Sequence, residues 1–142
     1  MVNKIQIDSC SIISTHLKRP AQKNIEMSIT HVLTSELNYL SPSDRIVHLY
    51  IEGVVTSKNI VDLRIEMIPY YINIDNPTKT QQLKKGILFT TQIELDRVLE
   101  DIVKEVKWVL DYFGLTIMYI VRNFKTIKIE KQGKGYTLEY MH

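Results

Sequence analysis

Apolar residues recur at steps of three and four positions through the second half of the chain, and this period most constrains the fold. Such spacing puts apolar side chains on one stripe of a helix, so it predicts an amphipathic α-helix over Gln92–Phe113, about 33 Å long at about 1.5 Å per residue. Thr91 followed by Glu94 is typical of a capping box, and Gly114 suits the helix end. The stripe residues expected to face a sheet are Val98, Leu99, Ile102, Val106 and Val109.

Alternation of apolar and polar residues predicts strands before this helix. Odd positions of residues 25–39 are mostly apolar and even positions mostly polar, which predicts one long strand with a bend or bulge. Residues 4–13 predict another strand. Their apolar phase moves from odd to even positions, which indicates a β-bulge near Ser9.

Two hairpins are predicted as well. Residues 46–56 are rich in β-branched and aromatic residues, and residues 61–67 alternate strictly. The short segment Ser57-Lys58-Asn59 lies between these runs, which favours antiparallel pairing. Pro69 cannot donate to a sheet ladder, so the second run either continues at an edge or changes direction there. Further strands are predicted at 115–121, 127–130 and 136–140, the last two forming a C-terminal hairpin.

The expected fold is therefore α+β. It consists of an antiparallel sheet of four or more long strands, one long helix packed on it and a C-terminal β-hairpin. The 142 residues suit a single domain spanning 1–142, because single cores commonly hold about 100–150 residues. Hydrophobic residues make up 44% and charged residues 24%, which is typical of a globular chain and not of a disordered one.

The absence of targeting and membrane-spanning signals indicates the compartment. Residues 1–8 lack the apolar core of a signal peptide, and no apolar run is long enough to span a membrane. A single cysteine, Cys10, excludes an internal disulfide and any cysteine-based zinc site, and it is compatible with a reducing environment. We expect a cytoplasmic protein.

No motif indicates catalysis. The histidines show no metal-ligand spacing, and His31 is expected to be a partly buried core residue, with a metal pair between His31 and His48 as the alternative. Cys10 is expected to be an inert, buried thiol. The carboxylates of the predicted strands point outward without converging, so we expect a protein that is not an enzyme and has no cofactor, catalytic residue or metal site.

Charge is uneven along the chain, although the net charge is only +2. Acidic residues predominate in 87–115, which fits a solvated helix face or a docking face for a basic partner. Basic residues predominate in 116–142, with aromatic residues between them. Such a pattern allows nucleic-acid binding as an alternative function. The candidate residues are Arg122, Lys125, Lys128, Lys131 and Lys134.

The order of predicted elements resembles that of the SecB-like export chaperones. The local match is Ile87-Leu88-Phe89 before the long helix, followed after the helix by Gly114 and the apolar segment 115–120, and the resemblance covers about residues 4–121. It implies a binding protein that holds extended or unfolded polypeptide segments. A divergent viral or toxin–antitoxin member fits this pattern better than a housekeeping chaperone.

Two further expectations concern the oligomeric state and the peptide-binding surface. One helix cannot cover both faces of a long sheet, so uncovered apolar positions predict a homo-oligomer, a dimer or tetramer. The predicted peptide-binding residues are aromatic and Met side chains, which adapt to varied ligands: Tyr50, Met67, Tyr70 and Tyr71. The alternatives are a small viral or adaptor protein-interaction module and the nucleic-acid binder.

Overall fold

The computed structural model describes residues 5–37, 45–72, 80–82, 86–113 and 126–141. In chain order the elements are β1 (Ile5–Ile13), α1 (Arg19–Leu37), β2 (Arg45–Val55), β3 (Ile60–Ile72), β4 (Thr80–Gln82), β5 (Gly86–Glu94), the 3₁₀ turn η2 (Leu95–Arg97), α2 (Val98–Phe113), β6 (Thr126–Gln132) and β7 (Gly135–Met141).

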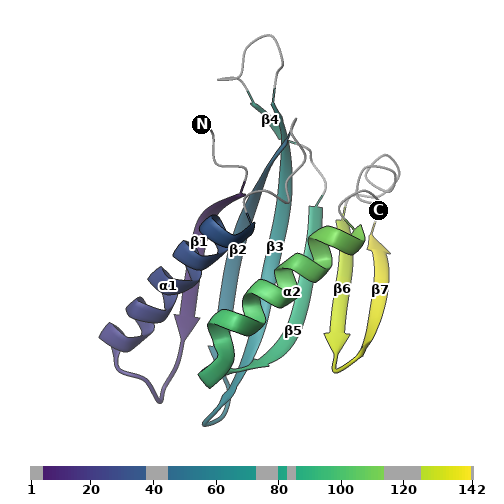
Figure 1. Cartoon of the computed structure of the whole chain (residues 1–142). Coiled ribbons are helices and arrows are strands. Elements are labelled where there is room, and N and C mark those ends of the chain that lie inside the picture. Colours follow the sequence, from purple (N-terminus) through teal and green to yellow (C-terminus); the bar gives the residue numbers. More distant parts are fainter. Residues whose placement is uncertain (1–4, 38–44, 73–79, 83–85, 114–125, 142) are drawn as a thin grey trace.

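One mixed sheet joins all the strands (Figure 1). Its order is β1-β2-β3-β5-β6-β7, and the short β4 pairs with the end of β3. The pairs β1–β2 and β5–β6 are parallel, while β2–β3, β3–β5 and β6–β7 are antiparallel. The chain thus runs through the pattern strand–helix–strand–strand twice, each helix connecting two parallel neighbours.

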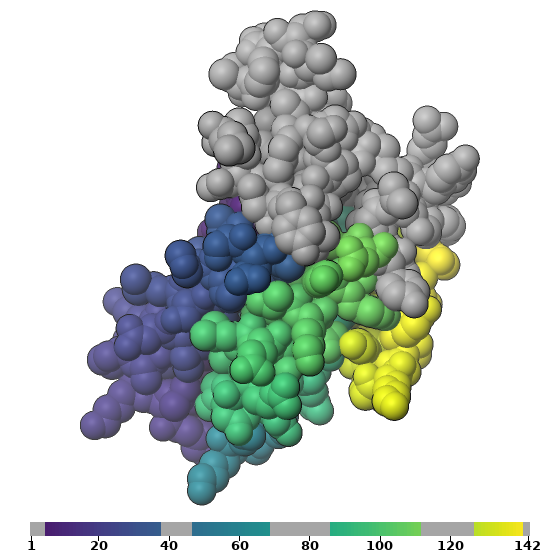
Figure 2. Space-filling model, viewed as in Figure 1, coloured from purple at the N-terminus to yellow at the C-terminus, as the bar shows by residue number. Residues whose placement is uncertain are grey.

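Both helices cover the same face of the sheet. Figure 2 shows α1 and α2 side by side on this face, and Figure 1 shows the strands behind them. The core lies between the two layers and contains apolar residues from both helices and from β1, β2, β3, β5 and β6. Its largest fully buried side chain is Phe89, and the helices contribute the buried residues Ile29, Leu33, Ile102 and Val106 to the same core.

The antiparallel sheet with a single helix was a wrong prediction, because residues 25–37 belong to α1 and not to a strand. Ile29, Leu33 and Leu37 are buried at steps of four, and a step of four fits a helical period as well as a period of two. The intervening odd positions decide the matter, since His31 and Ser35 are exposed, as is Met27 before them. Because α1 connects β1 to β2, these strands can be parallel neighbours.

The long helix begins later than predicted. Ile87, Phe89 and Ile93 alternate with more exposed residues through β5, so this segment obeys the strand period up to Glu94. Thr91 and Glu94 therefore form no capping box. Instead Asn59, in the β2–β3 turn, accepts the backbone N–H of Leu95 at its carbonyl and that of Asp96 at its side-chain oxygen.

Several predicted elements are confirmed. β2 and β3 form the predicted hairpin, β6 and β7 form the C-terminal hairpin, and the β1–β2 register shifts between Ile7 and Ser9 as the bulge requires. β3 continues through Pro69, which pairs with Val47. Of the predicted sheet-facing residues of the helix, all are buried except Leu99, which is 38% exposed. The predicted strand 115–121 lies outside the described residues.

Candidate functional site

The face of the sheet opposite the helices is mainly polar, and we call it the open face. It presents the even-numbered residues of β2, β3, β5 and β6, whose odd-numbered neighbours are buried under the helices. The strand register aligns these residues into rows across the sheet. One row runs from β1 to β7 through Ser11, Glu52, Arg64, Thr90, Glu130 and Thr137.

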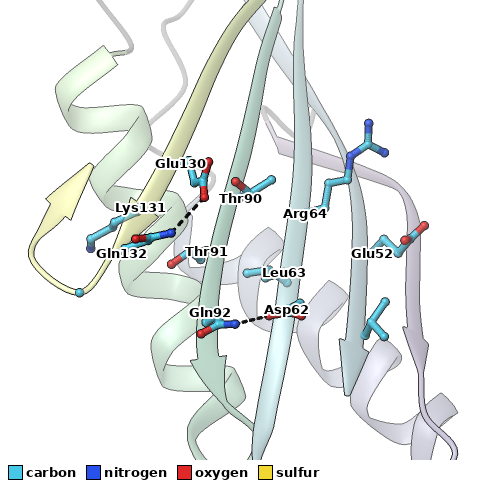
Figure 3. A pocket seen from close by; sticks show the side chains of 12 residues that line it. Glu52, Asp62, Leu63, Arg64, Thr90, Thr91, Gln92, Glu130, Lys131 and Gln132 are labelled. Atoms are coloured by element: carbon cyan, nitrogen blue, oxygen red, sulfur yellow. Dashed lines mark hydrogen bonds between the residues drawn. The ribbon is translucent and has the colours of Figure 1, made fainter. Parts of the chain in front are cut away.

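A groove of about 650 Å³ crosses the open face along this row (Figure 3). Pairing between β5 and β6 ends at Thr90 and Glu130 within the groove, and the two strands diverge beyond this point. Gln92 then lies on one side of the gap and Gln132 on the other. The groove is therefore a consequence of the sheet splitting between β5 and β6.

Carboxylates surround the groove. Glu52, Asp62 and Glu130 line it, and Arg64 is the guanidinium among them. The Gln92 amide donates to Asp62 over 2.7 Å, and the Gln132 amide donates to Glu130 over 3.1 Å. These bonds hold the two carboxylates in place while leaving further oxygen lone pairs for a ligand.

A second, smaller hollow of about 220 Å³ adjoins the groove toward β1. Glu52 and Arg64 line both hollows, so the two form one depression. The second hollow adds Tyr50 and Glu66, and Arg64 forms an ion pair of 3.2 Å with Glu66. With Glu66 included, four carboxylates line the depression together with Arg64 and Lys131, and Glu105 already pairs with Lys131, so the depression carries a surplus of negative charge.

At the β1 side of the open face, Asp8 and His48 form a pair. Asp8 is the residue at the bulge, and its Oδ2 lies 2.8 Å from His48 Nδ1. Both side chains are largely shielded, with 29% and 16% of their areas exposed. The pair links β1 to β2 at the point where the bulge interrupts their regular register.

The structure does not bring the predicted peptide-binding residues together on one surface. Tyr50 is half-buried on the open face, whereas Met67 is 1% exposed on the helix-covered face. The side chains of Tyr70 and Tyr71 lie outside the described residues.

The predicted basic residues are also divided between faces. Lys128 belongs to the open face, opposite Glu139, and Lys134 is exposed in the turn between β6 and β7. Lys131 borders the groove, but its Nζ is directed to α2, where both carboxylate oxygens of Glu105 bind it at 2.8 and 3.0 Å. Arg122 and Lys125 lie outside the described residues.

Lys131 is part of a cluster that ties the C-terminal hairpin to α2. Its ammonium lies 4.8 Å from the centre of the Trp108 ring, and Trp108 contacts Tyr136 edge to face at 5.3 Å. The Lys131 and Glu105 side chains are 18% and 17% exposed. The cluster has a structural role, because its charged groups already satisfy each other.

The remaining sequence candidates have simple placements. His31 is exposed on α1, so the prediction of a partly buried core residue is wrong. His48, the other half of the predicted metal pair, binds Asp8 and not His31. Within the described ranges, no three His, Cys, Asp or Glu side chains gather as a metal site would require. No helix among the described elements is long and apolar enough to cross a membrane.

Comparison of the chain with protein-family models, with curated proteins and with solved structures gives no match. The open face is therefore the candidate site. Its outward carboxylates on β2 and β3 are visible in the sequence, but their proximity is not. The strand register brings these carboxylates together, because it aligns Glu52 with Arg64 and Thr90 with Glu130 across four strands.

Proposed function

We propose that this protein is a non-enzymatic binding protein that holds an extended polypeptide segment with basic side chains against the open face. The observation that carries the proposal is the depression across the sheet, in which the carboxylates Glu52, Asp62, Glu66 and Glu130 outnumber the cations Arg64 and Lys131. Lysine and arginine side chains of a bound segment would pair with the surplus carboxylates, and complementary charge of this kind favours encounter and selects the partner.

The shape of the depression suits a chain more than a compact ligand. It follows a row of residues across several strands, so an extended segment lying along it meets one side chain per strand. Thr90, Gln92 and Gln132 supply neutral donors and acceptors beside the carboxylates. Such groups can bond the backbone of a bound segment whatever its sequence.

The same charge argues against the nucleic-acid alternative at this surface. Phosphate binding depends on released counterions and on lysine or arginine contacts, whereas the depression presents carboxylates. Of the basic residues proposed for nucleic acid, Lys131 is already bound by Glu105. Nucleic-acid binding therefore has little support from the described residues.

The proposal keeps the polypeptide-holding activity that the SecB-like resemblance implies, but it changes the chemistry of the bound segment. The resemblance rested on four strands before the long helix, and residues 25–37 are helical. An apolar segment would require exposed apolar side chains, and Met67 is covered by the helix layer. The adaptor alternative differs only in having one dedicated partner.

Peptide binding tests the proposal directly. A fluorescent peptide alternating Lys and Ser should bind, and a Glu–Ser peptide of the same length should not. Affinity should fall with added salt, because exposed charge pairs are screened. The variant combining Glu52→Gln, Asp62→Asn and Glu130→Gln should bind about tenfold more weakly, at about 0.5 kcal/mol for each of three exposed pairs.

The matched control is Glu100→Gln, an exposed carboxylate on α2, which should leave affinity unchanged. Equal binding by the triple variant and the wild type would refute the site. Suppression of aggregation of a neutral, apolar unfolded protein, without binding of the Lys–Ser peptide, would favour the chaperone alternative. Binding of a single natural partner, with no response to unrelated basic peptides, would favour the adaptor.

A further inference from the structure

β1 forms one edge of the sheet and, among the described strands, pairs only with β2. Its outward edge is marked by one bond: the backbone N–H of Ile12 donates to Oε1 of Glu26, on α1, over 2.9 Å. The Glu26 carboxylate thus occupies the place where the carbonyl of an added strand would stand. Since backbone groups alternate in direction along a strand, those of Cys10 face the same side as those of Ile12.

Two features hinder strand addition at this edge, the bulge at Asp8 and the Glu26 carboxylate, but others are missing. Such edges commonly carry lysine, proline or inward-pointing charge, and residues 9–13 are uncharged and contain no proline. Apolar side chains are exposed beside it in both layers, with Ile13 50% exposed on the strand and Met27 71% exposed on α1. A hollow of about 590 Å³ between β1 and α1 lies along the same border, with Met27, Cys10 and Glu26 in its lining.

We propose that β1 pairs antiparallel with β1 of a second copy of this chain, about a two-fold axis at Ser11. In this register Cys10 lies opposite Ile12 of the second copy, and Ile12 lies opposite Cys10 of the second copy. All four residues present their backbone groups to the interface, so two hydrogen-bonded pairs form. The match is symmetric, as a two-fold interface requires.

The side chains are compatible with this register. Ser11 meets Ser11 of the second copy, and Ser9 meets Ile13, so no charged residue opposes a like charge. Asp8 falls opposite Ser14, beyond the paired segment. Met27, which projects from α1 beside the edge, comes next to the helix layer of the second copy and loses its exposure to water.

Glu26 controls this pairing, because its carboxylate competes for the Ile12 N–H that an added strand needs. Replacing Glu26 by Ala should therefore strengthen self-association. A merely structural role for Glu26 would give the opposite result, since loss of the bond would loosen β1. The proposal concerns the edge of the sheet and is independent of ligand binding on the open face.

Cross-linking tests the register. Ser11 and its copy form a non-hydrogen-bonded pair, in which Cα atoms lie about 4.5 Å apart, within the range of about 4.4–6.8 Å that disulfides span. The Cys10→Ser, Ser11→Cys variant should form a disulfide-linked dimer under mild oxidation at micromolar concentration. The control is Cys10→Ser, Ser57→Cys, because Ser57 is equally exposed but lies in the β2–β3 turn.

Sedimentation of the wild type provides a measurement that needs no substitution. It should show a monomer–dimer equilibrium that Glu26→Ala shifts toward dimer. Equal cross-linking of both cysteine variants would mean random collision and would overturn the register. A wild type and a Glu26→Ala variant that both remain monomeric at micromolar concentration would overturn self-pairing.

Discussion

Cys10 shows how one residue's surroundings determine its chemistry. Burial, and after it the Glu26 carboxylate, raise the pKa of its thiol to about 12, against a hydrogen bond with Thr30 that lowers it. The reactive species is the thiolate, so the folded protein presents an unreactive thiol at neutral pH. This supports the sequence-based expectation of an inert thiol, although the side chain is partly and not fully buried.

Alkylation kinetics test this at the residue scale. With the pKa near 12 in place of 9.0, the thiolate fraction at pH 8 falls by about a thousandfold. Native protein should therefore react with iodoacetamide far more slowly than protein unfolded in urea, and its rate should rise about tenfold per pH unit up to the pKa. Glu26→Gln should speed the native reaction by removing a negative charge. Equal rates for native and unfolded protein would contradict this account.

At the scale of elements, α2 depends on a narrow buried stripe. Ile102 is 0% exposed and Leu99, one turn earlier on the neighbouring flank, is 38% exposed. Ile102→Ala should therefore lower the free energy of unfolding by about 2–5 kcal/mol, since it leaves a cavity in the core. Leu99→Ala should lower it by less than about 1 kcal/mol. Urea denaturation of both variants measures the difference in the free energy of unfolding. Similar losses would contradict the placement of Ile102 inside the buried stripe and Leu99 outside it.

The two helices also show which elements a sequence can predict. The α2 stripe combines steps of three and four, which no strand produces, so its helix was predictable. The fully buried residues of α1, Ile29, Leu33 and Leu37, lie at steps of four, and that spacing satisfies both periods. The start of α2 was missed because Ile93 and Leu95 fit either pattern, while the actual cap, Asn59, comes from a distant turn.

At the scale of the whole molecule, the strand register determines which residues lie together, and the sequence alone does not reveal this register. The alternation of Glu52, Asp62 and Glu66 was visible in the sequence, but the strand order that places Glu130 beside Thr90 depends on a parallel β5–β6 pair. That pair is made through α2 and through tertiary packing, which local patterns do not encode. The mixed sheet was not predicted for a related reason. Reading α1 as a strand removes the helix that connects the parallel strands β1 and β2.

The same topology predicts a gradient of stability across the sheet. β3 is paired on both sides, with β2 and β5, and its helix-facing side chains are buried. β7 pairs only with β6 in the described chain, and Tyr136 and Tyr140 are 49% and 44% exposed. Backbone amides should exchange with solvent most slowly in 61–67 and much faster in β7, because exposed edges open locally at lower cost.

Lys131 makes this gradient testable, since its ion pair with Glu105 and its contact with Trp108 attach the hairpin to α2. Hydrogen exchange followed by mass spectrometry should show that Lys131→Met accelerates exchange in β6 and β7 while leaving β3 unchanged. Met keeps the apolar stem, so the effect isolates the lost charge and leaves Glu105 unpaired. Lys134→Met, in the exposed turn of the same hairpin, should change neither region. Acceleration spread evenly over all strands would mean that the hairpin and the remaining sheet unfold as one unit, and the gradient would be refuted.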